Sequence, residues 1–390
     1  MALDFDSSRL ANPYLTEDHR AWRDQLRKFF DAEVMPYAAD WDEAGEIPDF
    51  LWAKAAEMGI LGLGYPEEYG GVSDGIDIWH KNILSDELAR IGVGGLGASL
   101  MVHSIGLPPV VKFGQENVRK LVVPAVISGE KRISLGITEP GAGSDVAQLT
   151  TTANRDGDHY VVNGSKTLIT GGMKANWVTT AVRTGGAGAG GVSTLLIPTD
   201  SEGFSRTAID KKQGWWASDT ATLYFDNVRV PVENLLGQEN RGFSVIMHNF
   251  NGERLGMSVS MIGAARVCLE EAVNWARERK TFGKRLADHQ VIRHKIAEMK
   301  MRINATEAYL QVVCAESVRG NENVGDIAML KVQCSQTMEY CAREAMQVLG
   351  GAGYIRGNRV ERIYREVRVN AIGGGSEEIM RDLAARQYGL

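Results

Sequence analysis

The sequence is poor in cysteine, in blocks of like charge and in long apolar runs, and each absence excludes a class of protein. The four cysteines all lie in the C-terminal part and form no Cys-x-x-Cys pair: Cys268, Cys314, Cys334 and Cys341. This pattern argues against a disulfide framework and favours reduced thiols used as small core residues. The net charge of −6 is spread along the chain, which argues against nucleic acid or an acidic membrane as a partner.

Two further absences concern targeting. No apolar run approaches the roughly 18 residues of a membrane span, so we expect no span. The first residues carry Asp4 and Asp6 and no apolar core segment, so we expect no signal or transit peptide. These observations predict a cytoplasmic protein of bacterial type, or a mitochondrial matrix protein that has already been processed.

What is present indicates a globular chain of more than one domain. Of its 390 residues, 44% are hydrophobic and 24% are charged, as in soluble globular proteins. The length exceeds that of a single hydrophobic core, so two or three domains are expected. Apolar periodicity changes from helical to strand-like near residue 131 and back near residue 241. We therefore predict a helical domain over 1–130, a β domain over 131–240 and a helical bundle over 241–390.

Capping residues and periodicity also predict individual elements. In the first domain, Thr16 caps a helix that runs to Pro36, and other helices are expected at Phe50–Met58, at Ile76–Ile91, after Pro108 and at Gln115–Leu121. In the second, strands are expected at Tyr160–Thr170 with Asn163-Gly164 as a hairpin turn, Asn176–Arg183, Val192–Ile197 and Ala221–Val230. In the third, apolar stripes within 261–275, 292–313 and 327–348 predict long antiparallel helices.

Two glycine-rich stretches could hold phosphate, and they differ in context. The run Gly185–Gly191 lies between two predicted strands with no helix after it, so we interpret it as a flexible connection. The stretch Thr138–Asp145 follows an apolar strand, and its successive amide groups could form a nest for anionic oxygens. It is not the dinucleotide fingerprint, because no helical pattern or acidic partner follows at the required spacing. Alone, it is a weak signal.

Further motifs accompany this stretch in a fixed order along the chain: Lys166-Thr-Leu-Ile-Thr-Gly-Gly, Arg279-Lys-Thr-Phe-Gly, His289-Gln290, Gln347-Val-Leu-Gly-Gly and Gly373-Gly-Gly-Ser-Glu-Glu-Ile. Together they resemble the acyl-CoA dehydrogenases over essentially the whole chain. The resemblance implies an α+β fold: an N-terminal α-helical domain, a middle β-sandwich or barrel, and a C-terminal four-helix bundle, assembled as a homotetramer. It also implies FAD as the cofactor, an acyl-CoA substrate oxidised to the trans-2-enoyl-CoA, and electron-transfer flavoprotein as the acceptor.

By this resemblance, one set of residues contacts the FAD of the same subunit and another set the FAD of a neighbouring subunit. The first set is Thr138, Gly143, Ser144, Leu168, Thr170, Ser376 and Glu378. The second set is Arg279, Phe282, Gln290, Gln347 and Gly351. The planar fork of Arg279 suits a diphosphate, because it can hold two oxygens at once. The resemblance assigns acyl-CoA binding to Ser144, Asn251, Arg254, Gly373, Gly374 and Arg386.

The catalytic base is where this sequence departs from the common family pattern. Many members carry a glutamate where this chain has Gly374, whose backbone N–H can still donate to the thioester carbonyl. A smaller subset places the base in a Glu-Arg-Leu motif, which this chain has at Glu253-Arg254-Leu255. We therefore predict Glu253 as the base, with its affinity for protons raised by desolvation. The alternatives are a first-turn helix acid at 253, and Glu377 or Glu378 as the base.

Two other departures affect the substrate and the flavin. Leu168 stands where members often have Trp or Phe beside the isoalloxazine ring, and Gly373 stands where many have Tyr. Small residues at both 373 and 374 favour a branched or bulky acyl group. An oxygen-using flavin oxidase of the same fold and a non-catalytic acyl-CoA-binding subunit are the alternative functions.

Two remaining patterns are interpreted as structural. The arginines at 356, 359, 362, 365 and 368, with Glu361 and Glu366 between them, indicate an ion-paired helix surface or a subunit contact rather than a phosphate-binding ridge. His289 and His294 are five residues apart and so point in different directions on a helix, which argues against a metal site.

Overall fold

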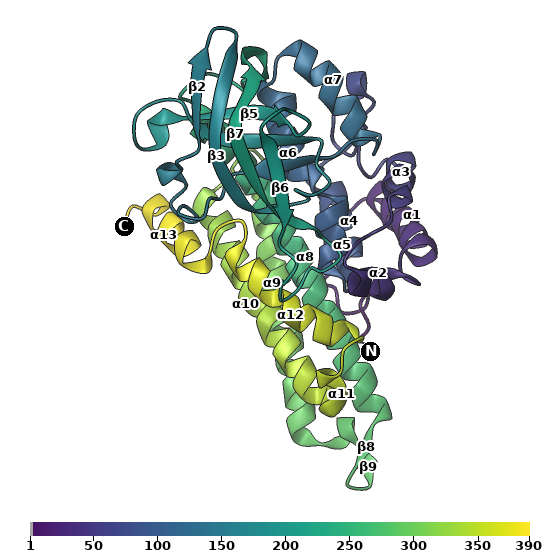
Figure 1. The fold of residues 1–390 in the computed structure, drawn as a ribbon. Coiled ribbons are helices and arrows are strands. Elements are labelled where there is room, and N and C mark those ends of the chain that lie inside the picture. Colours follow the sequence, from purple (N-terminus) through teal and green to yellow (C-terminus); the bar gives the residue numbers. More distant parts are fainter. Residues whose placement is uncertain (1–2) are drawn as a thin grey trace.

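The computed structural model describes residues 3–390 and shows three parts in chain order (Figure 1). Seven helices come first, a sheet of seven strands follows, and long helices end the chain. The sheet lies at one end of the molecule and the long helices extend away from it toward the other end.

The N-terminal helices begin where the capping signals predict. Thr16 accepts a hydrogen bond from the backbone N–H of His19 and caps the first helix, whose Leu26, Phe29 and Phe30 are buried. The helices are α1 (Glu17–Glu33), α2 (Ala38–Ala44), α3 (Phe50–Glu57), α4 (Ile78–Arg90), α5 (Gly94–Leu100), α6 (His103–Phe113) and α7 (Glu116–Ile127). The predictions for α1, α3, α4 and α7 are confirmed, whereas α2 and α5 were not predicted.

The helix predicted after Pro108 is present, but it begins five residues earlier, so that α6 contains both Pro108 and Pro109. A proline inside a helix removes an N–H donor and leaves a carbonyl four residues earlier without its partner. Here the carbonyl of Ile105 instead accepts a hydrogen bond from Asn249 Nδ2 at 3.2 Å. A side chain from a later helix thus satisfies the group that Pro109 leaves open.

The stretch Gly94–Phe113, which forms α5 and α6, is apolar enough by length and composition to cross a membrane. The expectation that no apolar run approaches the length of a membrane span is therefore wrong by length and composition. The most apolar window of this stretch is 56% buried inside the protein, and a buried core helix passes the same test. The stretch is therefore weak support for a membrane span.

The middle part is one curled seven-stranded sheet rather than two stacked sheets (Figure 1). The strand order is β1-β4-β2-β3-β7-β6, and β5 pairs with β4. The strands are β1 (Ile133–Gly136), β2 (Thr152–Asp156), β3 (His159–Thr170), β4 (Trp177–Arg183), β5 (Val192–Pro198), β6 (Phe204–Ala208) and β7 (Thr220–Pro231). The run Gly185–Gly191 connects β4 to β5, as predicted, and Arg183 donates to the carbonyls of Gly186 and Gly188.

The predicted hairpin turn at Asn163-Gly164 is wrong. β3 runs through both residues, and the hairpin turn lies earlier, at Gly157 between β2 and β3. Gly164 marks a shift in the register between β3 and β7 and has a φ of +143°. The glycine therefore serves a bulge, which bends the strand without ending it.

The C-terminal helices follow the predicted apolar stripes, and Met261, Ala265, Cys268 and Ala272 are buried in their shared core. The elements are α8 (Gly242–Glu278), β8 (Lys280–Thr281), β9 (Lys284–Arg285), α9 (Gln290–Val318), α10 (Val324–Leu349), α11 (Gly351–Tyr354), α12 (Arg359–Ile372) and α13 (Glu377–Gln387). α10 packs on α8, α9, α12 and α13 and is the central helix of the bundle. All four cysteines are buried, and none forms a disulfide within residues 3–390.

Every arginine of the 356–368 series forms an ion pair, as predicted. Arg356 pairs with Glu43, Arg359 with Glu270 and Glu271, Arg362 with Asp42, Arg365 with Asp42 and Glu361, and Arg368 with Glu339. These pairs join α12 and its N-terminal approach to α2, α8 and α10. The side chains therefore hold helices together rather than forming a phosphate-binding ridge.

A buried ion pair fixes the start of the Thr138–Asp145 loop. Glu139 accepts hydrogen bonds from the Thr150 N–H and hydroxyl at 2.6 and 2.7 Å, from the Thr151 N–H at 2.9 Å and from Lys166 Nζ at 2.8 Å. Although burial opposes the charge, Lys166 and these hydrogen bonds lower the pKa of Glu139 to about 2. Burial lowers the pKa of Lys166 to about 8, although the charge and the hydrogen bond of Glu139 act in the opposite direction.

The bulge at Gly164 predicts a stability effect that a hairpin turn would not give. A Cβ at Gly164 would lie 2.6 Å from Thr151 Oγ1, in a backbone conformation that side chains rarely adopt. We expect Gly164→Ala to lower the free energy of unfolding by about 3 kcal/mol. Gly157→Ala is the matched control, since that glycine has a φ of +61° with open space around it, and should cost about 1 kcal/mol. If urea unfolding shows equal losses of stability for the two variants, the assignment of a bulge at Gly164 is wrong.

The Glu139–Lys166 pair predicts a pH-dependent stability. The pKa of Glu139 falls from an ordinary value of 4.5 to about 2, so its contribution is fully present above pH 4.5 and is lost as pH falls toward 2. We expect Glu139→Gln to be less stable than the native protein by about 3 kcal/mol at pH 7, and this difference should shrink at pH 3. Glu202→Gln, at an exposed residue of the same domain, should show no such trend in urea unfolding at the two pH values.

Candidate active site

The candidate base, Glu253, is half-buried on α8, and one of its carboxylate oxygens, Oε2, is buried without a hydrogen-bond partner. It lies eleven residues after the start of α8 at Gly242, so the alternative of a first-turn helix acid is wrong. Its Oε2 is inaccessible to solvent and accepts no hydrogen bond from residues 3–390. Burial raises the pKa of Glu253 to about 7, while the charges of Arg254 and Lys331 act in the opposite direction. Such an oxygen is available to a proton donor that the protein itself does not supply.

The glycine turn between α12 and α13 lies against the same part of α8. Arg254 Nε donates to the Gly374 carbonyl at 3.1 Å. Met257, four residues after Glu253 and therefore on the same face of α8, fills the space beside the turn. A Cβ at Gly374 would lie 2.9 Å from Met257 Sδ, and one at Gly373 would lie 3.9 Å from Met257 Cε. The turn that carries Gly373 and Gly374 therefore lies against the stretch of α8 that follows Glu253.

Two residues of this region were missed by sequence reasoning. Met257 gives no signal in the sequence beyond its spacing from Glu253. Lys331 is fully buried on α10 and donates from Nζ to the Gly375 carbonyl at 2.7 Å. Its signal was a lysine set among the buried apolar residues Ile327, Leu330 and Cys334. A buried lysine in an apolar stripe requires a partner and thereby marks a polar site.

The other carboxylates near the turn are already engaged or exposed. Glu377 accepts from Ser335 Oγ at 2.6 Å and also contacts Gln336 and Arg381, so it points toward α10. Glu378 is exposed, and hydrogen bonds to its own backbone N–H and to Ser376 lower its pKa. Ser376 itself caps α13 by accepting from the Ile379 N–H at 3.4 Å. Neither glutamate has a buried, unpartnered oxygen like Oε2 of Glu253.

The Thr138–Asp145 loop leaves backbone accessible to a ligand. Glu139 and Ala142 exchange two backbone hydrogen bonds across a tight turn. Apart from the glycine itself and its two neighbours along the chain, no heavy atom of the described residues lies within 4 Å of a Cβ built at Gly141 or Gly143, and Ser144 is exposed. The amide groups of this loop can therefore be approached closely by anionic oxygens. These features fit the pyrophosphate of FAD.

The predicted flavin-side residues of β3 lie next to this loop. The Thr167 N–H donates to the Thr138 carbonyl at 2.8 Å, which joins the end of β3 to the loop. Leu168 has a φ of +60° and is 61% exposed, while Thr170 is half-buried at the strand end. Strained, exposed non-glycine residues are concentrated at binding sites. The structure therefore brings Thr138, Gly143, Ser144, Leu168 and Thr170 into one region.

A second group of predicted cofactor residues lies at the opposite end of the molecule. Arg279, Phe282 and Gln290 surround β8 and β9, and Gln347 and Gly351 lie where α10 meets α11 (Figure 1). All five are exposed, and Phe282 is 97% exposed with a φ of +50°. One protomer does not bring this group to the loop at Thr138. The resemblance assigns these residues to the FAD of a neighbouring subunit.

The two remaining predicted substrate contacts engage in local interactions. Asn251 Nδ2 donates to Glu322 Oε1 at 2.5 Å, and Asn251 Oδ1 accepts a hydrogen bond from Arg254 Nη1 at 3.4 Å. Arg386 is exposed and pairs with Asp382 within α13 at 2.8 Å. Asn251 is thus connected to the Glu253 region through Arg254, and Arg386 is not.

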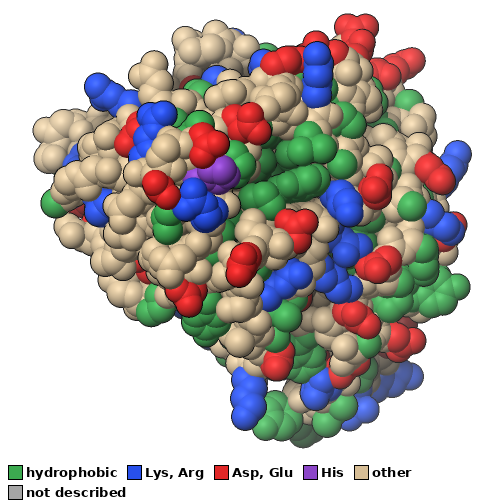
Figure 2. Space-filling model, turned by 45° about the horizontal axis from the view of Figure 1, so that its top comes forward, with side chains coloured by type: hydrophobic (Ala, Val, Ile, Leu, Met, Phe, Trp, Pro, Cys, Tyr) green, Lys and Arg blue, Asp and Glu red, His purple; other side chains and the backbone are tan. Residues whose placement is uncertain are grey.

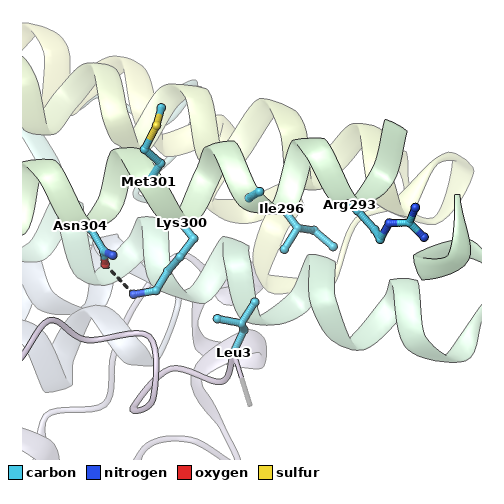
Figure 3. Close-up of a pocket in the computed structure, with 7 residues that line it drawn as sticks. Leu3, Arg293, Ile296, Lys300, Met301 and Asn304 are labelled. Atoms are coloured by element: carbon cyan, nitrogen blue, oxygen red, sulfur yellow. Dashed lines mark hydrogen bonds between the residues drawn. The ribbon is translucent and has the colours of Figure 1, made fainter. Parts of the chain in front are cut away.

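A hollow elsewhere on the surface has different chemistry. It lies along α9 (Figure 3), and none of the described residues that line it is a carboxylate: Leu3, Arg293, Ile296, Ala297, Lys300, Met301 and Asn304. The surface also shows no extended region of one charge on the face in Figure 2, where acidic and basic side chains are interspersed. Neither feature offers an alternative catalytic centre.

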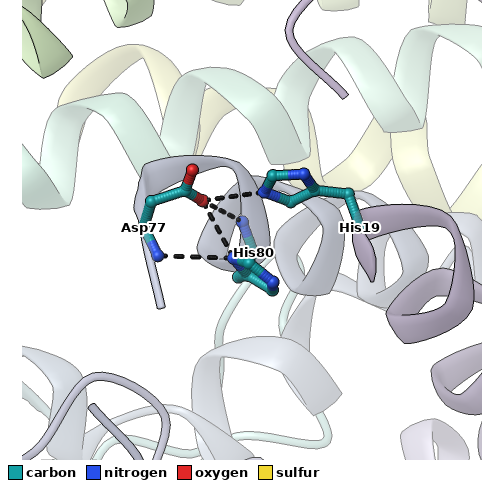
Figure 4. Close-up of side chains that lie close together, drawn as sticks. All are labelled: His19, Asp77 and His80. Carbon is teal, nitrogen blue, oxygen red and sulfur yellow. Dashed lines mark hydrogen bonds and ion pairs between the residues drawn. The ribbon is translucent and has the colours of Figure 1, made fainter. Parts of the chain in front are cut away.

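Two histidines and an aspartate from distant parts of the chain meet at the N-termini of α1 and α4 (Figure 4). Asp77 Oδ1 lies 2.9 Å from both His19 Nε2 and His80 Nδ1, and it accepts from the Trp79 and His80 N–H groups at 2.9 and 3.2 Å. The remaining ring nitrogens contact Thr16 and Asp18. These contacts describe two helix caps, Thr16 on α1 and Asp77 on α4, that are joined by the contact between His19 and Asp77.

Comparison with known proteins agrees with this geometry. The chain matches the N-terminal, middle and C-terminal domains of acyl-CoA dehydrogenase over residues 16–130, 134–228 and 240–389. It is 35% identical to the mitochondrial long-chain specific acyl-CoA dehydrogenase of Sus scrofa, over 95% of this chain and 86% of that protein.

Solved structures are equally similar. A probable acyl-CoA dehydrogenase from Mycobacterium abscessus superposes with a TM-score of 0.93 at 44% identity, covering 96% of this chain and 99% of the other. A glutaryl-CoA dehydrogenase from Mycobacterium smegmatis, solved in complex with FADH2, gives a TM-score of 0.90 at 26% identity, covering 96% and 95%. The chain belongs to the acyl-CoA dehydrogenase family and is a flavin-dependent oxidoreductase.

Proposed function

We propose that the protein dehydrogenates a medium-chain, long-chain or branched acyl-CoA to the trans-2-enoyl-CoA, with Glu253 as the base. The observation that carries this proposal is the unpartnered Oε2 of Glu253, buried where α8 faces the glycine turn. A carboxylate that must accept a weakly acidic α-proton benefits from such an environment, because desolvation raises its proton affinity.

The residues around Glu253 can perform the proton transfer and stabilise the charge that develops. FAD, when bound, supplies the acceptor for the hydride that leaves the β-carbon. Glu253 takes the α-proton, and the Gly374 N–H donates to the thioester carbonyl as negative charge develops there. Arg254 holds the turn through the Gly374 carbonyl and also stabilises the ionised form of its neighbour Glu253.

FAD would be held by the loop at Thr138–Ser144 and by Leu168 and Thr170 of the same subunit. The relative solved with FADH2 supports a flavin nucleotide as the cofactor. Arg279, Phe282, Gln290, Gln347 and Gly351 would contact the FAD of a neighbouring subunit, because their exposed positions lie far from the loop of their own chain. This arrangement requires an oligomer, for which we propose a homotetramer, and we propose electron-transfer flavoprotein as the acceptor.

The space for the acyl chain is narrower near Gly374 than two small residues alone would suggest. Met257 Sδ occupies the position that a side chain at Gly374 would need, whereas the nearest atom to a Cβ at Gly373 is the Val369 carbonyl oxygen at 3.1 Å. A branch on the acyl group would therefore pack against the flexible thioether of Met257.

Replacement of the base should abolish turnover while the cofactor remains bound. We expect Glu253→Gln to retain FAD and to lower the rate of flavin reduction by about a thousandfold or more, because a general base contributes roughly 10²–10⁴-fold. The measurement is anaerobic stopped-flow absorbance at the flavin band, with a panel of straight-chain and 3-methyl-branched acyl-CoA thioesters. Wild-type reduction by a member of the panel also identifies the substrate class.

Glu377→Gln is the matched control, because Glu377 lies beside the same turn but is hydrogen-bonded to α10. It should keep a rate within a few-fold of the wild-type rate. A Glu253→Gln variant as fast as the wild type would refute the base assignment. If no thioester reduces the flavin of the wild type either, the equal rates of the two proteins would instead favour a non-catalytic role. Aerobic turnover that releases peroxide without another acceptor would instead indicate an oxidase.

The pKa of Glu253 predicts the pH dependence of the free enzyme. Only the ionised carboxylate can accept the α-proton, and burial raises its pKa from 4.5 to about 7. We therefore expect kcat/KM for flavin reduction to rise with pH and to level off above an inflection near pH 7. An inflection near pH 4.5 would show that Glu253 is solvated in the working enzyme.

A further inference from the structure

Lys331 is fully buried on α10, yet its ammonium group reaches the glycine turn of the candidate active site. Its Nζ donates to the Gly375 carbonyl at 2.7 Å. Arg254 on α8 donates to the preceding carbonyl, that of Gly374, at 3.1 Å. Two cations from different helices therefore hold two consecutive carbonyl groups of one turn.

The turn needs external support because it consists of three consecutive glycines. Gly374 and Gly375 have φ values of +67° and +108°, and no side chain of their own packs them in place. Glycine has the largest backbone freedom to lose on folding. A hydrogen-bond donor that stabilises a developing oxyanion acts only if its position is fixed to a few tenths of an ångström. Hydrogen bonds to the two following carbonyls provide that restraint for the Gly374 N–H.

The positive charge of Lys331 also acts on Glu253. This charge lowers the pKa of Glu253 and so favours the ionised base, although the charge of Arg254 has the larger effect. The charged groups that face Lys331 are Glu253 and Arg254 from α8 and Glu377 and Glu378 from α13. Burial lowers the pKa of Lys331 itself to about 8, and the negative charge of Glu377 is the largest influence that raises it. The ammonium form therefore persists through neutral pH.

We propose that Lys331 is a positioning residue for the dehydrogenation, which fixes the Gly374–Gly375 backbone toward the thioester carbonyl and acts on Glu253 through its positive charge. The inference rests on the proposed function of Glu253 and Gly374. Lys331 acts through these two groups and contacts neither reacting carbon. A lysine that merely filled a buried position would affect stability and leave the pH dependence of the rate unchanged.

Three substitutions separate the hydrogen bond from the charge. Lys331→Met removes both, Lys331→Gln keeps a donor without charge, and Lys331→Arg keeps both. Lys300→Met is the matched control, because Lys300 on α9 also donates to a backbone carbonyl, that of Ser8 at 2.7 Å, and is not part of the site. Each FAD-loaded variant is reduced anaerobically with the acyl-CoA that reduces the wild type, across pH 5.5–9.

We expect Lys331→Met to slow flavin reduction by about tenfold to a hundredfold at saturating substrate, as a misplaced donor does. Its acidic inflection should move to higher pH by about one unit, because Glu253 loses a neighbouring positive charge. Lys331→Gln should show the same shift with a smaller loss of rate, and Lys331→Arg should restore the wild-type inflection. Lys300→Met should match the wild type in both rate and inflection.

An unchanged inflection in both Lys331→Met and Lys331→Gln would overturn the proposal, whatever the effect on stability. If the methionine variant does not fold with FAD, the comparison of glutamine with arginine decides, because both keep a donor and differ in charge. Failure of the proposed function would be seen separately, because no acyl-CoA thioester would then reduce the flavin of the wild type. That result would overturn this inference as well.

Discussion

The site depends on keeping an ionisable carboxyl group out of water without giving it a hydrogen-bond donor. An unsatisfied buried oxygen costs about 1–3 kcal/mol, and an isolated buried charge costs more. The protein limits this cost by placing Arg254 and Lys331 close to Glu253 rather than in contact with its orphaned oxygen. The carboxyl group thus keeps a pKa near neutrality and an oxygen open to a proton donor. An ion pair in direct contact would have been more stable and chemically inert.

The same two cations hold the glycine turn, so in the proposed mechanism one pair of side chains supports both the base and the N–H group that would bind the thioester carbonyl. Each cation comes from a helix of the bundle, and the turn that they hold joins α12 to α13. Rigid helices fix a site more accurately than loops do. The conformational freedom of three consecutive glycines is therefore removed by neighbours that are themselves firmly packed.

α8 relates this centre to the rest of the molecule. Its first residue, Gly242, meets β5, where a Cβ would lie 2.2 Å from the Ser193 carbonyl carbon. One turn before Glu253, Asn249 donates to the carbonyl that Pro109 leaves open in α6. Further along, Arg266 pairs with Asp86 of α4 and Glu307 of α9. One continuous helix therefore sets the distance between the base and the sheet domain that carries the Thr138 loop.

Local patterns in the sequence predicted the parts of the structure that depend on short-range chemistry. Helical stripes, the Thr16 cap and the Glu-Arg-Leu motif each involve residues within a few turns of one another. Interactions between distant segments were not predicted. The role of Gly164 depends on Thr151 and the register with β7, and the contact that joins Asp77 to His19 spans 58 residues. The importance of Lys331 appears only when α10 meets a turn 44 residues later.

A glycine at position 374 agrees with the proposed placement of the base on α8. With a φ of +67°, this position favours glycine over any residue with a side chain, and Met257 Sδ already occupies the space that a Cβ would need. A glutamate there would require both a strained backbone and the movement of Met257. With the carboxylate on the helix, the turn needs only to present its N–H, and a glycine does this with the least strain. Met257 lies one helical turn after Glu253 on the same face of α8, and its thioether fills the space beside the turn that a side chain at position 374 would need.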